Sequence, residues 1–133
     1  MLVEGAIANQ EHLEMIHQVR DRTKILISFG DCAVTGNVTA LRHPLTQGAD
    51  SPAARTQSVL DRAYLETATH PQLPESDLVP VLLSQVVPVH KAVPVDVYLP
   101  GCPPDASRIQ AVLEPLLSGG SPQLPDAEYI RFA

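Results

Sequence analysis

Both cysteines of this chain stand in the same kind of local setting, which makes them the first candidates for chemistry. Cys32 lies in "SFGDCAVTGN" and Cys102 lies in "VDVYLPGCPP", and each follows an apolar, strand-like run and a glycine. Soft thiolates at one place suit an iron–sulfur cluster or a zinc ion. Glycines such as Gly101 let the backbone turn sharply and approach a ligand closely. The pattern therefore predicts a binding site that contains Cys32, Cys102 and Gly101.

Other interpretations of the cysteines stay open at this point. A buried cysteine is often only a small hydrophobic residue, and two thiolates do not complete the ligand set of a cubane cluster. A disulfide is geometrically possible, but two cysteines in 133 residues are not typical of a disulfide scaffold. A zinc site that uses His43 or His90 lacks the usual C-x-x-C or H-x-x-x-H spacing.

The elements that must position the cysteines are three apolar, β-branched runs. These are "MLVEG" (1–5), "KILISFG" (24–30) and "VDVYLPG" (95–101). Near-continuous apolar runs are typical of strands covered on both faces of a parallel sheet. A helix that begins near Gln10, capped by Asn9, separates the first two strands. A last helix follows Asp105 or Ser107, and Gly119 and Gly120 end it. The pattern predicts an open α/β sheet.

The middle of the chain gives weaker signals. We expect a polar loop over residues 42–55, a helix over residues 58–67 and a break in "HPQLPESD". Residues 78–87, "LVPVLLSQVV", fit a short helix or an extended core segment, and periodicity does not decide between them.

Ligands of open parallel sheets bind in the crevice at the carboxyl ends of the strands. Cys32 and Cys102 both leave such ends, so we expect both thiols at the same edge of the sheet. Glu4 ends the first strand at that edge and is a further candidate binding residue. Asp31 is either part of the ligand loop or a turn and helix-cap acid. His12 and His17 are five residues apart on the first helix and are expected at the surface.

Composition limits the classes of function. The formal net charge is −6 and no Lys/Arg cluster occurs, so binding to nucleic acid or to an anionic membrane is not expected. No run approaches the roughly 18 apolar residues of a membrane span, and the first ten residues are not typical of a secretory signal. The small number of cysteines favours a reducing compartment, so we expect a cytoplasmic protein. Because no apolar run is long enough, we expect no membrane insertion.

Three segments carry a resemblance to a known family. "LVEGAI", "FGDCAVTGNVTALRHPL" and "VPVDVYLPGCPP" resemble the small subunit of cytoplasmic nickel–iron hydrogenases, in particular the NAD-reducing bidirectional type. The wider superfamily includes the 20 kDa-type subunit of respiratory NADH:quinone oxidoreductase. The resemblance covers Met1 to about Leu117, and the "GNVTALR" run favours the hydrogenase branch.

The resemblance implies a flavodoxin-like fold and one proximal [4Fe–4S] cluster held by four cysteines. Cys32 matches the third of these ligands and Cys102 the fourth. Glu4 matches the glutamate of the family's E-G motif, which lies near the cluster and the large-subunit face. The cluster would pass electrons between the nickel–iron large subunit and a diaphorase that contains flavin and clusters. The catalytic metal would lie outside this subunit.

The chain departs from the family pattern at its start. It has no C-x-x-C motif, and Met1 falls inside what should be the family's third strand. We therefore expect an N-terminally truncated flavodoxin-like sheet with helices on both faces, about three contiguous strands and an open edge at residues 1–5. We also expect a native polypeptide that is longer at its N-terminus. The iron–sulfur small-subunit domain would span residues 1–118, followed by an irregular tail over residues 119–133.

Two other functions remain open. The chain could be a truncated remnant or a subunit-interaction module that no longer binds a cluster. It could also bind a flavin, since "TGNVT" offers hydroxyls and backbone N–H groups to a phosphate, although this segment follows the wrong strand for the usual phosphate loop.

Overall fold

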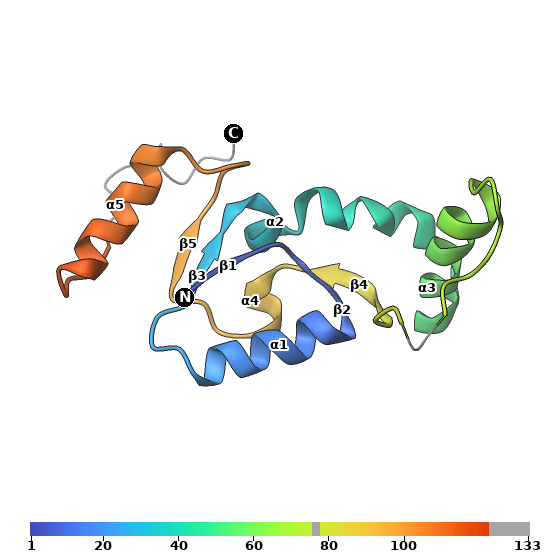
Figure 1. Ribbon diagram of the computed structural model, residues 1–133, viewed down its shortest axis with the longest axis horizontal. Coiled ribbons are helices and arrows are strands. Elements are labelled where there is room, and N and C mark those ends of the chain that lie inside the picture. Colours follow the sequence, from blue (N-terminus) through green and yellow to red (C-terminus); the bar gives the residue numbers. More distant parts are fainter. Residues whose placement is uncertain (76–77, 123–133) are drawn as a thin grey trace.

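A three-stranded parallel sheet lies at the centre of the computed structural model, which describes residues 1–75 and 78–122. Its strands are β1 (Leu2–Glu4), β3 (Ile27–Phe29) and β5 (Val97–Leu99), in the order β1-β3-β5 (Figure 1). Glu4 pairs with Phe29, and Phe29 pairs with Leu99, so the carboxyl ends of all three strands are level. The predicted three contiguous parallel strands are confirmed. Among the described residues, the outer edge of β1 has no partner strand.

The two long helices begin where their capping residues predict. Helix α1 (Gln10–Asp21) is capped by Asn9, whose side-chain oxygen accepts the His12 N–H at 2.8 Å. Helix α5 (Ala106–Leu117) is capped by Asp105, whose carboxylate accepts the Arg108 N–H at 2.9 Å. An oxygen at this position satisfies an amide that has no partner inside the helix.

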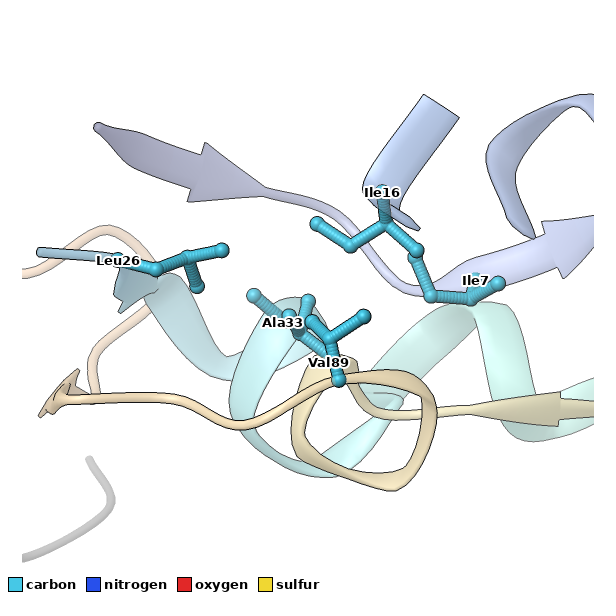
Figure 2. Packing of buried hydrophobic residues seen from close by; sticks show 6 residues of the cluster. Ile7, Ile16, Leu26, Ala33 and Val89 are labelled. Carbon is cyan, nitrogen blue, oxygen red and sulfur yellow. The ribbon is translucent and has the colours of Figure 1, made fainter. Parts of the chain in front are cut away.

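Helices cover both faces of the sheet because β3 sends successive apolar residues to opposite sides. Leu26, just before β3, joins the cluster between the sheet, α1, α2 (Gly30–Thr35) and α4 (Val89–Ala92) (Figure 2). Ile27 packs on the other face against α5. The buried members of the first cluster are Ile7, Ile16, Leu26, Ala33, Val89 and Val93, and those of the second are Ile27, Leu99 and Val112.

A second sheet was not predicted from the sequence. β2 (Ile7–Asn9) pairs antiparallel with β4 (Leu82–Val87), with an irregular register between Ile7 and Asn9. The sequence left residues 78–87 open between helix and extended chain, and the extended form is correct for Leu82–Val87. β2 escaped prediction because a three-residue strand has too little periodicity to recognise.

The predicted polar loop over residues 42–55 is wrong in part. The 3₁₀ helix η1 (Asn37–Thr46) and the helix α3 (Pro52–Leu60) occupy both of its ends, and α3 continues into the π-helical turn η2 (Asp61–Glu66). Ser51 caps α3 by accepting the Ala54 N–H at 3.2 Å, and Pro52 stands in its first turn. Serine followed by proline is a helix start signal, which explains why the helix begins before the predicted residue 58.

Parts of two predicted segments lie outside the described residues. These parts are residues 76–77 of the predicted break and residues 123–133 of the predicted tail. In residues 1–75 and 78–122, no helix has the length and apolar character needed to cross a membrane.

One carboxylate joins the end of α1 to the sheet. The Oδ2 atom of Asp96 accepts the Leu26 N–H at 2.8 Å and a hydrogen bond from Arg20 at 2.6 Å. The hydrogen bond from Leu26, followed by that from Arg20, lowers the pKa of Asp96. Because its folded-state pKa lies below the unfolded value, Asp96 stabilises the fold above about pH 4 and loses this effect as pH falls further.

We predict that Asp96→Asn lowers the free energy of unfolding by about 1 kcal/mol at pH 7, a modest value because the Asp96 side chain is 45% exposed and water screens the pair. The difference between wild type and variant should shrink as pH falls below 4. Urea unfolding of both proteins at pH 7, 5 and 3.5 measures it. A difference that stays constant with pH would mean that the carboxylate charge is not what stabilises this joint.

We predict that Ser28→Ala is neutral or stabilises the protein by up to about 1 kcal/mol. Ser28 is fully buried in β3, and its hydroxyl has no hydrogen-bond partner among the described residues. Removal of a buried polar group without a partner recovers its desolvation cost. Leu26→Ala, at a site equally buried, should cost about 2–5 kcal/mol. Urea unfolding tests both, and a loss above about 1 kcal/mol for Ser28→Ala would show that the hydroxyl does have a partner.

Candidate functional site

The two cysteines lie at the same edge of the sheet, as the sequence predicts. Cys32 lies in the first turn of α2, directly after β3, and Cys102 lies three residues after the end of β5. β3 and β5 are adjacent parallel strands in register, so the two segments leave the sheet side by side. Within the described chain neither thiol is in a disulfide; Cys32 is partly exposed and Cys102 is exposed.

Two reciprocal hydrogen bonds fasten these segments together. The Asp31 N–H donates to the Gly101 carbonyl at 3.0 Å, and the Gly101 N–H donates to the Asp31 carboxylate at 2.6 Å. Asp31 is only 8% exposed and Gly101 is buried. We call this pair the Asp31–Gly101 clamp. It places the residue before Cys102 against the residue before Cys32, 70 positions apart in the sequence.

Asp31 therefore has a different role from the helix cap considered in the sequence. The N-cap of α2 is Phe29, which makes no side-chain capping bond, and the Asp31 carboxylate instead reaches across to the loop after β5. The sequence signal for this role was the similarity between the "GDC" and "PGC" motifs. A single sequence does not tell from which backbone amide an aspartate side chain accepts a hydrogen bond.

Only glycine fits at position 101. Its φ of +135° is a conformation that side chains rarely adopt, and a Cβ there would lie 2.5 Å from the Pro104 Cα. Gly30 also has a positive φ, of +80°, and a Cβ on it would lie 3.5 Å from the Gly101 carbonyl oxygen. These two glycines permit the close approach of the two segments.

The described residues alone do not satisfy a [4Fe–4S] cluster. Such a cluster needs four protein ligands, and residues 1–75 and 78–122 contain no group of three or more His, Cys, Asp or Glu side chains placed to hold a metal. Glu4 is exposed at the carboxyl end of β1, at the level of Phe29. The chain thus presents two thiols and a carboxylate at one edge of the sheet. The two thiols are half of the four cysteine ligands of a [4Fe–4S] cluster.

The histidines considered for zinc have other contacts. His43 Nε2 accepts the Val86 N–H at 2.9 Å, and the His90 ring packs edge-on against Tyr98 with 5.8 Å between centroids. His12 and His17 are exposed, as expected.

The "ALRH" run also has a structural role that the sequence did not indicate. The Arg42 guanidinium donates to the Ala8 carbonyl at 3.1 Å and to the Leu83 carbonyl, and so it bridges β2 and β4. Burial lowers the pKa of Arg42. Together with His43, Arg42 fastens η1 to the sheet that β2 and β4 form.

The fold and the site define the class: an open α/β protein with paired thiol-bearing segments at the carboxyl ends of adjacent parallel strands. The chain belongs to the family described as "NADH ubiquinone oxidoreductase, 20 Kd subunit", whose profile matches residues 1–116. The resemblance stated from the motifs is confirmed.

Relatives in this family are hydrogenase subunits. The chain is 33% identical to the delta subunit of the NAD-reducing hydrogenase HoxS of Cupriavidus necator, over 94% of this chain and 58% of that protein. It is also 33% identical to a subunit of the F420-non-reducing hydrogenase of Methanothermobacter marburgensis, over 94% of this chain and 39% of that protein. The chain therefore spans less than two thirds of the length of these relatives.

A solved structure shares the fold. The chain superposes on a chain of an NAD+-reducing [NiFe]-hydrogenase, crystallised in its H2-reduced state, with a TM-score of 0.79 and 32% identity. The match covers 98% of this chain and 69% of that one. This similarity confirms an α/β fold of the hydrogenase small-subunit type.

We predict that Asp31→Ala costs about 1–3 kcal/mol of stability, because it leaves the buried Gly101 N–H without an acceptor. Asp31→Asn keeps a carbonyl oxygen at that position and should cost less. Hydrogen exchange of the Gly101 amide should be faster in Asp31→Ala than in Asp31→Asn, relative to wild type. Equal exchange rates in all three proteins would contradict the clamp.

Proposed function

We propose that this chain is the electron-transfer small subunit of a nickel–iron hydrogenase, with Cys32 and Cys102 as two of the four ligands of a proximal [4Fe–4S] cluster. The observation that supports this most is the Asp31–Gly101 clamp, which holds the two thiol-bearing segments together at one edge of the sheet. The membership of the 20 kDa-type family and the hydrogenase relatives support the same assignment.

Each site residue has a distinct part in this proposal. When bound, the cluster supplies a one-electron carrier. Cys32 and Cys102 bind it as thiolates, and Gly101 lets the backbone approach it. Asp31 is a positioning residue, because it fixes the distance between the two segments without contributing a thiolate. Glu4, exposed at the same edge, faces the large subunit.

The partners follow from the same edge. A nickel–iron large subunit would dock over the carboxyl-end segments, from Glu4 to the run of residues 32–42. Val38 and Leu41, one turn apart on η1, are 62% and 70% exposed in this chain, which suits a surface that a partner covers. A diaphorase is the proposed second partner, since one relative and the superposed structure are NAD-reducing enzymes. We propose a cytoplasmic location for the complex.

Ligand count leads to a prediction for the chain by itself. Because two thiolates meet only half of a cubane's requirement, anaerobic reconstitution of the 133-residue chain with iron and sulfide should give well under one cluster per chain after desalting. Iron and acid-labile sulfide analysis, with a visible spectrum, measures this. Four irons and four sulfides per chain, stable to desalting, would mean that two cysteines suffice and that the ligand count does not limit binding.

The assembled complex provides the test of function. Cys32→Ser and Cys102→Ser should each lower the iron content of the affinity-purified complex and its hydrogen-dependent electron transfer, while the large subunit still co-purifies. Ser118→Ala, at the exposed C-cap of α5, is the control and should leave both unchanged. Unchanged iron and activity in both cysteine variants would favour an interaction module without a cluster. Recovery of this chain only as a lone monomer would contradict the proposed partners.

A further inference from the structure

A polar cleft lies away from the cysteine edge, between the end of η1, the loop that follows it, α3 and β4. Its volume is about 380 Å³. In Figure 1, α3 lies at the opposite end of the molecule from β5 and α5. The cleft is lined by His43, Pro44, Thr46, Gln47, Gly48, Ala49, Arg55 and Gln85. Nothing in the proposed cluster site uses these side chains.

Arg55 lies in the first half of α3, and in residues 1–75 and 78–122 no carboxylate forms an ion pair with it. Its Nε atom is buried and has no hydrogen-bond acceptor among the described residues. Other arginines have clear partners: Arg20 pairs with Asp96, Arg62 with Glu66, and Arg42 with two backbone carbonyls. A buried N–H of a charged group without an acceptor is costly, so such a group calls for a ligand that accepts from it.

His43 adds a second donor to the same cleft. Its Nε2 accepts the Val86 N–H at 2.9 Å, which places the proton of the neutral ring on Nδ1. In residues 1–75 and 78–122 no acceptor is found for this Nδ1–H. The backbone of β4 therefore fixes the tautomer of His43, and the Nδ1–H is the remaining ring donor of this cleft-lining residue.

The charge of the lining is opposite to that of the chain. The chain carries 15 acidic and 9 basic residues, yet none of the eight described residues that line the cleft is acidic. Asp50, the nearest acid along the chain, is exposed and is not part of the lining. The side-chain amides of Gln47 and Gln85 are further potential donors. The cleft thus offers donors and one full positive charge.

We propose that this cleft binds an oxyanion, either a carboxylate or a phosphate group, with Arg55 as its anchor and the His43 Nδ1–H as a second donor. Guanidinium groups match the geometry of both anions and form charge-assisted hydrogen bonds with them. The same group could come from a free small anion or from a side chain of a partner subunit. This inference does not depend on the cluster or on the hydrogenase assignment.

The test uses the full 133-residue chain, isotopically labelled and titrated separately with sodium phosphate and with sodium acetate at ionic strength held constant by sodium chloride. The NMR signals of the Arg55 Nε–H and of the Val86 amide, which reports on His43, should shift and saturate in the millimolar range with at least one of the two anions. Saturation by phosphate alone assigns a phosphate group, and saturation by acetate assigns a carboxylate.

Variants make the assignment specific. Arg55→Gln should weaken binding at least about tenfold, because a charge-assisted hydrogen bond is lost. Arg22→Gln, which removes an exposed arginine at the end of α1, should change it by less than about twofold. If Arg55→Gln fails to fold, Arg55→Lys decides the question, because it keeps the charge but lacks the Nε–H and should still bind at least about threefold more weakly.

Two results would overturn the proposal. One is the absence of a saturable shift at the Arg55 Nε–H with either anion in the wild-type chain. The other is an equal loss of binding in the Arg55 variants and in Arg22→Gln, since that would indicate a general effect of charge.

Discussion

The Asp31–Gly101 clamp is the interaction on which the candidate site depends. Its two hydrogen bonds join segments that are 70 residues apart, and each partner satisfies a backbone group of the other segment. A buried carboxylate is tolerated here because it accepts a hydrogen bond from a buried N–H. The glycines at positions 30 and 101 are required for this close approach, because both adopt positive φ and their backbones lie in contact. Without this joint, the parallel register of β3 and β5 would bring the cysteine segments to one edge but would not fix their separation.

The rest of the fold supports that edge from two sides. Leu26 and Ile27 are consecutive residues that belong to two different apolar clusters, so β3 is held between α1 on one face and α5 on the other. Arg42 and His43 fasten η1 to β2 and β4 through backbone groups. The sequence motifs therefore have two roles. "GDC" and "PGC" form the cysteine edge of the parallel sheet, and "ALRH" fastens η1 to β2 and β4.

The sequence predicted the parts of the fold that depend on local signals. The three apolar runs, the Asn9 cap and the common edge of the two cysteines follow from strand and helix rules and agree with the structure. Of the two candidate caps of the last helix, Asp105 and Ser107, the structure selects Asp105. The pairing of β2 with β4 and the contacts of Asp31 and Arg42 could not be predicted, because each joins residues that are distant in sequence. α2 and η1 were missed for a different reason: Gly36 and Pro44 are typical chain breakers, although Gly36 only separates two helices and Pro44 lies inside the second.

We propose that Cys32 and Cys102 bind the same cluster in the assembled complex. The most direct measurement is a crystal structure of the natural complex with anomalous diffraction recorded at the iron edge. We predict one compact group of iron peaks bonded to both sulfur atoms, with the Asp31–Gly101 hydrogen bonds intact beside it. Iron bonded to neither cysteine, or cysteine segments that are separated in the complex, would contradict it.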